Sequence, residues 1–159
     1  MDIKIVKKLD PQELDQIVKL HQKALSESFI NNFGENFIKN SYKTSLESSG
    51  NIFLIISENN KILGYLLATE NSHNFNTYIV QKNFFTLIPT ILKALVKKPL
   101  LIFHLLKWYL SSFFQENSRP ELKYVAISKD LRGKGLGTQL LNKLRNEYKK
   151  RHIKNYIVG

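Results

Sequence analysis

The feature that most constrains the fold of this chain is a glycine-rich segment at residues 132–137, which reads Arg-Gly-Lys-Gly-Leu-Gly. The preceding residues 121–127 are β-prone, and the residues that follow, to about Arg151, have the apolar spacing of an amphipathic helix. The apolar positions on one side of this expected helix are Leu136, Leu140, Leu141, Leu144 and Tyr148. The pattern therefore predicts a strand, a tight turn and a helix in immediate succession.

A turn of this kind favours the binding of a phosphate-bearing ligand. The glycines at 133, 135 and 137 remove side chains where phosphates would otherwise meet Cβ atoms. The first N–H groups of a helix lack partners within the helix and carry the positive end of its dipole, so that they form an anion site. Arg132 and Lys134 add formal positive charge beside these donors.

Two other glycine motifs do not fit the spacing. A P-loop requires Ser or Thr after Gly-Lys, whereas Gly135 follows Lys134. A dinucleotide fingerprint that starts at Gly133 requires glycine at 138, where Thr138 stands, and only 21 residues remain after Thr138 for the rest of that unit.

The remainder of the chain predicts one α/β domain over residues 1–159. Strands are expected at residues 3–7, 52–56, 62–68 and 153–158 besides 121–127, and helices at 11–25 and 35–47. Asp10 and Pro11 are helix-start signals, and residues 58–61 form the turn of a hairpin. The hairpin strands are almost continuously apolar, which predicts a central sheet covered on both faces.

Residues 81–114 form an unusual insert. They contain five lysines and no acidic residue, and Pro89 and Pro99 divide the apolar runs into short expected helices. No window reaches the roughly 18 uncharged apolar residues of a membrane span. The composition of residues 84–114 suits weak contact with an anionic membrane surface, or with an apolar acceptor that bears phosphate. An extra helical layer or a dimer interface is the structural alternative.

The formal net charge of +11 favours an anionic partner. The chain has no cysteine and its N-terminus has no signal-peptide core, so that a cytoplasmic protein is expected. No metal is expected, because the four histidines show no metal-ligand spacing. These are His21, His73, His104 and His152.

The pattern Arg-x-x-Gly-x-Gly, from Arg132 to Gly137, resembles the acetyl-CoA-binding signature of the GNAT N-acetyltransferase superfamily. Residues 125–131 before it and 138–141 after it resemble the rest of that motif, and the earlier order of strands and helices is similar. The resemblance implies a GNAT-like acyl-CoA N-acyltransferase fold of the α/β (α+β) class, with a mixed central sheet flanked by helices and a helical insert between strands three and four.

The resemblance also implies roles for particular residues. The backbone of Val125, Ala126 and Ile127 pairs with the pantetheine arm of acetyl-CoA as an extra strand would. The amides from Arg132 to Thr138 hold the pyrophosphate; the residues concerned are Arg132, Gly133, Lys134, Gly135, Leu136, Gly137 and Thr138. The N–H of Val125 or Ala126 stabilises the thioester oxyanion.

Glu121, at the start of this strand, is the best-placed candidate for the catalytic base, acting through a water molecule; a solvated strand-end carboxylate is the alternative. Glu70 is a weaker candidate. The chain departs from the family at its end, because the helix and hairpin that normally follow strand five are missing after Gly159. A homodimer or a weakened enzyme is therefore expected, since an unpaired strand at 156–158 exposes an edge.

The function expected is transfer of the acetyl group of acetyl-CoA, as co-substrate, to a primary amine of a small-molecule or glycan-linked acceptor. A similar helical insert occurs in acetyltransferases resembling enzymes of surface-glycan biosynthesis, which points to an amino-sugar or lipid-linked acceptor. The alternative is a catalytically weak or inactive acyl-CoA-binding module. A nucleic-acid binder is disfavoured, because it leaves the three glycines unused and few aromatic residues interleave with the basic ones.

Overall fold

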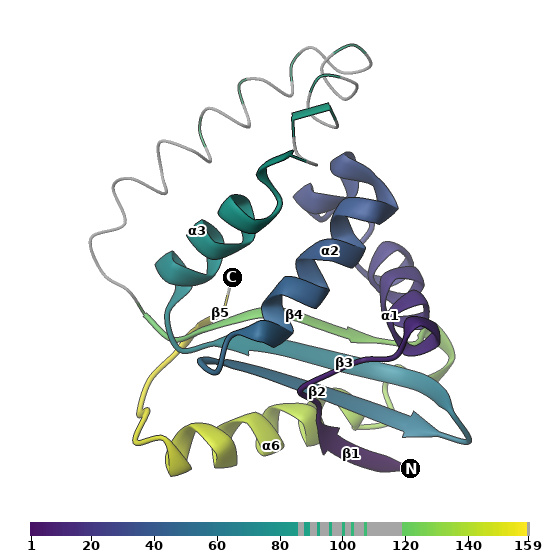
Figure 1. Ribbon diagram of the computed structural model, residues 1–159. Helices are drawn as coiled ribbons and strands as arrows, with labels where there is room; N and C mark the ends of the chain where they lie inside the picture. Colours follow the sequence, from purple (N-terminus) through teal and green to yellow (C-terminus); the bar gives the residue numbers. More distant parts are fainter. Residues whose placement is uncertain are drawn as a thin grey trace.

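The computed structural model describes residues 1–85 and 119–158, together with residues 88, 89, 92, 96, 100, 103 and 107 (Figure 1). The elements are β1 (Asp2–Ile5), α1 (Pro11–Ala24), η1 (Phe29–Phe33), α2 (Gly34–Glu47), β2 (Asn51–Glu58), β3 (Lys61–Thr69), α3 (Ser72–Lys82), β4 (Glu121–Ile127), η2 (Lys129–Leu131), α6 (Leu136–Lys150) and β5 (Ile157–Val158). Most of the insert expected at residues 81–114 lies outside the described residues.

The strands form one sheet in the order β1-β2-β3-β4-β5. The first four pair antiparallel, and β5 pairs parallel to β4. The β2–β3 hairpin turns through Asn59 and Asn60, whose φ angles of 49° and 61° suit a tight turn. The fold class expected from the sequence, a mixed sheet flanked by helices, is confirmed.

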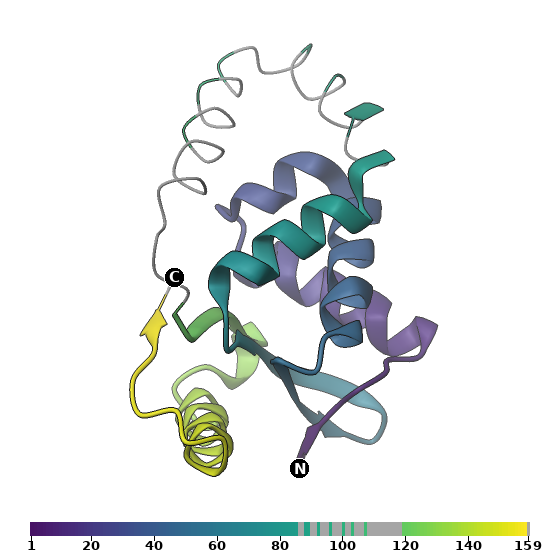
Figure 2. The ribbon, with the colours of Figure 1, turned by 60° about the vertical axis from the view of Figure 1, so that its left-hand side comes forward.

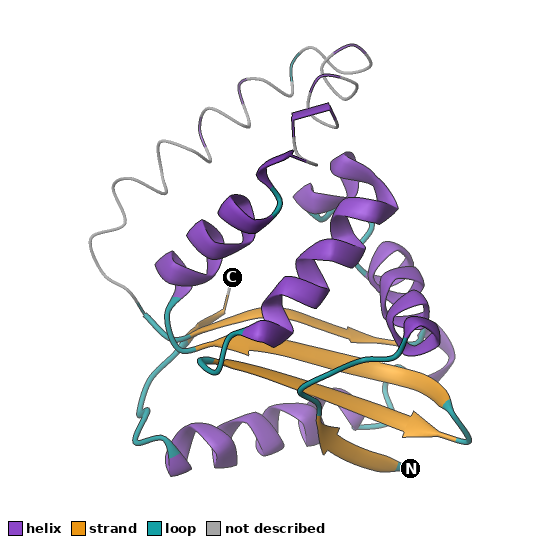
Figure 3. Cartoon of the chain, viewed as in Figure 1, coloured by secondary structure: helices purple, strands orange, loops and turns teal. Residues whose placement is uncertain are grey.

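Helices cover both faces of the sheet, as the apolar hairpin strands predicted. In Figure 3, α1, α2 and α3 lie on one face and α6 lies alone on the other, and the turned view of Figure 2 shows the same arrangement. The core under α1 and α2 includes Leu14, Ile17, Ile38, Tyr42, Phe53 and Tyr65. The core under α6 includes Leu54, Leu66, Leu122, Leu136, Leu140 and Leu144.

A β-bulge at Lys123 changes the alternation of β4. Tyr124 pairs with Leu67 and Leu122 pairs with Ala68, so that Lys123 is an extra residue without a partner on β3. Leu122 packs into the core under α6, whereas Tyr124 packs against the core under α1 and α2. The bulge therefore presents Lys123 and Tyr124 to the face that carries α1, α2 and α3, where Lys123 lies over Phe75 of α3.

Gly64 lets β3 approach the end of β4 closely. A Cβ atom at this position would lie 2.5 Å from Cδ1 of Ile127 and 3.0 Å from the carbonyl oxygen of Ala126. The N–H of Ser128 donates to the carbonyl of Leu63 over 2.8 Å, which fixes the point where the chain leaves β4 for the glycine-rich turn.

Two elements differ from the sequence prediction. The closing strand expected at residues 153–158 is only Ile157–Val158, because Ile153 and Tyr156 instead pack against the core under α6. Helix α3 occupies a segment that reads as polar and irregular; its N-terminus is capped by the side chain of Asn71, which accepts a hydrogen bond from the N–H of Asn74 over 2.8 Å.

Candidate active site

A cleft opens along β4 where β5 ends its pairing. β5 contacts β4 only at Glu121 and Leu122, so that in the described part of the chain the outer edge of residues 123–127 has no strand beside it. The cleft has a volume of about 500 Å³, and its lining residues are Ala24, Leu25, Ser26, Glu27, Ser28, Leu122, Lys123, Tyr124, Val125 and Val158. An open strand edge of this kind can pair with an extended ligand.

The backbone groups that face the cleft follow from the alternation of the strand. The N–H of Ser128 is directed at β3, and the carbonyl of Ala126 lies on the side of Gly64 of β3. Since successive residues direct their polar groups to opposite sides, the N–H and C=O of Val125 and Ile127 point to the open edge. Arg132 confirms this direction, because its Nε donates to the carbonyl of Ile127 over 3.4 Å.

The glycine-rich turn leaves the N-terminus of α6 open. Gly133 and Gly135 adopt φ angles of +78° and +77°, which L side chains rarely accept. Gly135 is the N-cap residue of α6, no side chain caps the helix, and its first turn has no acidic residue. A Cβ atom at Gly133, Gly135 or Gly137 would meet no atom within 4 Å. The turn is exposed, and its glycines form a cradle with donors and space that fit a diphosphate.

Glu121 and Lys123 form a shielded ion pair beside the cleft. Their Oε2 and Nζ atoms lie 2.7 Å apart, and each side chain is only 11% exposed. The ammonium of Lys123 also lies 5.3 Å from the ring centroid of Phe75. Lys123 lines the cleft, while Glu121 lies behind it. Lys123 was not among the site residues predicted from the sequence, although a lysine two residues after a glutamate within a strand is a signal for such a pair.

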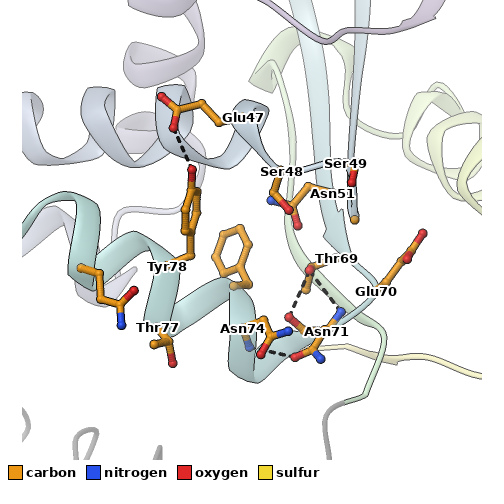
Figure 4. A pocket seen from close by; sticks show the side chains of 13 residues that line it. Glu47, Ser48, Ser49, Asn51, Thr69, Glu70, Asn71, Asn74, Thr77 and Tyr78 are labelled. Atoms are coloured by element: carbon orange, nitrogen blue, oxygen red, sulfur yellow. Dashed lines mark hydrogen bonds between the residues drawn. The ribbon is translucent and has the colours of Figure 1, made fainter.

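Glu70 does not belong to this cleft. Its Oε1 accepts a hydrogen bond from Arg151 over 2.5 Å. It lines a separate polar pocket of about 770 Å³ at the end of β3, between α2 and α3 (Figure 4). In that pocket the hydroxyl of Tyr78 donates to Glu47 over 2.9 Å.

An uncharged polar cluster lies behind the cleft wall. Nδ1 of His21 lies 2.6 Å from the hydroxyl of Tyr42 and 2.8 Å from that of Tyr65, and these hydroxyls are 2.6 Å apart. Burial lowers the pKa of His21 to about 4 and raises the pKa values of both tyrosines. Tyr124, whose ring lies edge-on to His21 at 5.1 Å, has its pKa raised to about 12, mainly by burial.

The protonation of this cluster follows from counting protons. With the proton on Nε2, Nδ1 accepts one tyrosine hydroxyl and the other hydroxyl donates to the first tyrosine, so that both hydroxyl protons are bonded. The opposite tautomer leaves one hydroxyl proton without an acceptor in the cluster. Nε2 is buried and no partner for it is found in the part of the chain that the structure describes. The apolar spacing of α1 signals a core position for His21 but not its partners.

The described residues contain neither a metal-binding group of three His, Asp or Glu side chains nor a helix long and apolar enough to cross a membrane.

Comparison with known proteins finds a family whose model resembles this part of the chain. Residues 101–158, which contain β4, the glycine-rich turn, α6 and β5, match the model of the acetyltransferase (GNAT) family. No curated protein matches the chain.

Several solved structures share the fold over nearly the whole chain. An aminoglycoside antibiotic 6'-N-acetyltransferase from Acinetobacter haemolyticus is 12% identical with a TM-score of 0.58, and the match covers 100% of this chain and 79% of that one. A ribosomal-protein-alanine N-acetyltransferase from Brucella melitensis is 11% identical with a TM-score of 0.52, covering 99% and 78%. An aminoglycoside 6'-N-acetyltransferase complexed with coenzyme A is 13% identical with a TM-score of 0.56, covering 100% and 61%.

At these identities the solved structures establish the fold, and the family model identifies the segment that carries the open helix end. Both agree with the resemblance noted in the sequence. Residues 101–158 are therefore similar to the GNAT acetyltransferase family, and the chain shares its fold with acetyltransferases of known structure.

Proposed function

We propose that this protein transfers the acetyl group of acetyl-CoA to a primary amine of a small-molecule or glycan-linked acceptor by direct attack. One observation carries the proposal: the uncapped, exposed N-terminus of α6 lies at the end of the strand whose outer edge is open. The helix end offers donors to a diphosphate, and the strand offers donors and acceptors to the amide-bearing arm that follows the diphosphate in coenzyme A.

The proposed contacts with acetyl-CoA run along this path. Within residues 132–138, the N–H groups of Arg132 and Lys134 already donate to the carbonyls of Lys129 and Leu131, over 3.3 and 3.4 Å. The pyrophosphate accepts hydrogen bonds from the other amides of this segment, and the side chain of Arg132 adds a charged donor. The pantetheine arm pairs with residues 125–127 of β4. Because the N–H of Val125 faces the open edge and that of Ala126 faces β3, Val125 is the proposed oxyanion donor.

Glu121 is the proposed base for the attacking amine, acting through a water molecule. The residue Glu121 is 8% exposed, and its carboxylate forms an ion pair with Lys123, which lines the cleft. A base in this position is shielded from bulk solvent and one side chain away from the reacting atoms.

The acceptor is proposed to enter beside the turn between α1 and η1. Ser26, Glu27 and Ser28 form this wall of the cleft and offer two hydroxyls and a carboxylate. Such groups suit an amine that carries further hydroxyl or amino groups. Two of the structurally similar enzymes are named for aminoglycosides, which supports an amino-sugar acceptor for this chain as well.

The test combines binding with turnover. Thermal unfolding is measured with acetyl-CoA, CoA and ATP, and thiol release is then followed with glucosamine, spermidine and a peptide with N-terminal alanine. We expect the two CoA compounds, but not ATP, to raise the Tm by several degrees, and at least one amine to release CoA. Stabilisation by the CoA compounds without thiol release would favour the acyl-CoA-binding module. Absence of stabilisation by either CoA compound would contradict the proposal.

A membrane-surface contact is proposed for the insert, and a cytoplasmic location for the protein. Seven of the ten large apolar side chains that are exposed among the described residues lie between positions 84 and 103: Phe84, Phe85, Ile88, Leu92, Val96, Leu100 and Phe103. The insert's lysines and lack of acids suit an anionic bilayer. Co-sedimentation with phosphatidylglycerol vesicles, but not phosphatidylcholine vesicles, is expected; self-association without vesicle binding would instead indicate the homodimer.

A further inference from the structure

Lys123 stands out among the charged groups of the cleft. The bulge in β4 directs Lys123 to the face of the sheet that carries α1, where the acceptor is proposed to enter. Lys123 lies two residues before the proposed oxyanion donor Val125. Its side chain is 11% exposed, and its ammonium lies between the carboxylate of Glu121 and the ring of Phe75. Ammonium groups are rarely so buried on a protein surface, and a shielded proton donor beside reacting atoms is a recurring catalytic arrangement.

We propose that Lys123 is the general acid of this reaction and donates its proton to the sulfur of the departing coenzyme A. The inference rests on the proposed function and adds a second catalytic group to it. Lys123 and Glu121 then act as one proton relay, joined by the 2.7 Å contact between Nζ and Oε2.

The proton balance closes within this pair. The amine nitrogen forms a bond to the thioester carbon, and the C–S bond breaks with its electrons going to sulfur. The proton lost by the amine nitrogen passes through water to the Glu121 carboxylate, while the Lys123 ammonium gives a proton to the thiolate. One proton then crosses from the Glu121 carboxylic acid to the Lys123 amine, which restores the ion pair without exchange with bulk solvent.

The same geometry gives Glu121 and Phe75 supporting roles. The carboxylate holds the ammonium in the cleft wall, and the ring face shields it from water. Tyr124 is less suited to protonate sulfur, since its ring is packed against His21 and Tyr42 in the cluster behind the wall.

The variant Lys123→Arg tests the proposal, because it keeps the positive charge and the ion pair but a guanidinium does not release its proton in proteins. Thiol release is measured with the fastest amine of the panel, using acetyl-CoA and the acetyl thioester of para-nitrothiophenol. With acetyl-CoA we expect kcat to fall about 100-fold, in the range of general acid catalysis, with KM unchanged. With the nitrothiophenol ester, whose leaving group is stable as a thiolate, we expect wild type and variant to differ by less than about threefold.

Lys149→Arg, an exposed substitution near the end of α6, is the matched control and should leave both rates unchanged. Equal ratios of wild-type to variant rate with the two donors would overturn the proposal, whether the variant is equally slow or equally active with both. The stabilisation of Lys123→Arg by CoA shows in each case that the variant is folded and binds. Absence of thiol release from the wild-type protein with every amine would instead defeat the proposed function, and this inference with it.

Discussion

Helices α1 and α6 are almost equal in length, at 14 and 15 residues, yet their N-termini are built in opposite ways. At α1 the Asp10 side chain accepts from the N–H of Glu13 over 2.8 Å, and the Glu13 side chain accepts from the N–H of Asp10 over 3.1 Å. At α6 the N-cap residue is Gly135, and no side chain satisfies the first turn. Side chains bind the free donors at the start of one helix, and no side chain binds those of the other.

The contrast extends along both helices. α1 carries the imidazole of His21 into the core, where it contacts two tyrosine hydroxyls and where burial lowers its pKa and keeps it neutral. α6 keeps most of its basic groups outside: Arg145, Lys149 and Lys150 are exposed. A helix that satisfies its polar groups internally contributes stability, whereas one that leaves donors free at its start forgoes about 1 kcal/mol of capping energy and gains an anion site.

Placing an acid at the open helix end should have the largest effect. Gly137→Asp puts a carboxylate into the first turn of α6, where a new Cβ meets no atom within 4 Å. The helix should be stabilised by about 0.3–1 kcal/mol through its dipole, while acetyl-CoA affinity should fall about a thousandfold, because juxtaposed like charges cost several kcal/mol. Calorimetric titration and thermal unfolding measure the two effects; Gly137→Ala is the uncharged control. An unchanged isotherm for the aspartate variant would refute the site.

The neutral cluster under α1 should make the protein sensitive to acid. The folded pKa of His21, about 4, lies below its ordinary value of about 6.5, so the unfolded chain takes up the proton first as the pH falls. This group's contribution to the free energy of unfolding is therefore complete above about pH 6.5 and declines by up to about 3 kcal/mol towards pH 4. Urea unfolding at about pH 7 and pH 4.5 should show a smaller pH dependence in His21→Asn. Identical pH dependence in both proteins would contradict the assignment.

Removing the charged donor at the open end should have a smaller effect. Arg132→Ala should weaken acetyl-CoA binding by about ten- to a hundredfold, since a hydrogen bond to a charged group contributes about 1.5–3 kcal/mol. The stability of the free protein should hardly change, because Arg132 is exposed and the hydrogen bond from its Nε to the carbonyl of Ile127 is long at 3.4 Å. Calorimetric titration of Arg132→Ala with acetyl-CoA measures this effect. An affinity of the variant equal to that of the wild type would show that the phosphates bind elsewhere.

Removing the N-terminal cap of α1 should have the smallest effect, and it should lower the stability of the protein rather than its affinity for acetyl-CoA. Asp10→Ala removes the capping box of α1 and should lower the free energy of unfolding by about 1 kcal/mol. Acetyl-CoA affinity should remain that of the wild type, because α1 covers the face of the sheet opposite to α6 (Figure 1). A loss of affinity as large as that of Arg132→Ala would contradict the proposal that only the start of α6 binds the ligand.

The parts of the site that local sequence determines could be predicted. The glycine-rich turn and the apolar stripe of α6 are set by residues a few positions apart, and the hairpin at Asn59 and Asn60 depends on the conformations that these residues tolerate. The strand at residues 121–127 was predicted too, but the bulge within it was not.

The parts that depend on distant segments could not be predicted. The bulge at Lys123 exists because β4 must register with β3 on both sides of it. The contacts of His21 come from α2 and β3, which bring Tyr42 and Tyr65 to it from 21 and 44 residues away. For the same reason the sequence left Val125 and Ala126 equivalent as oxyanion donors, whereas the pairing with β3 distinguishes them.

Because Lys123 is an extra residue in β4, Lys123 and Tyr124 follow each other on the same face of the sheet. Upstream of it the chain directs Leu122 towards α6, and immediately downstream Tyr124 points towards α1. Without Lys123, Leu122 and Tyr124 would be neighbours in a regular strand and would keep the faces that they have now. Loss of this residue should therefore leave both cores in place and remove only the charged side chain from the face that carries α1, α2 and α3.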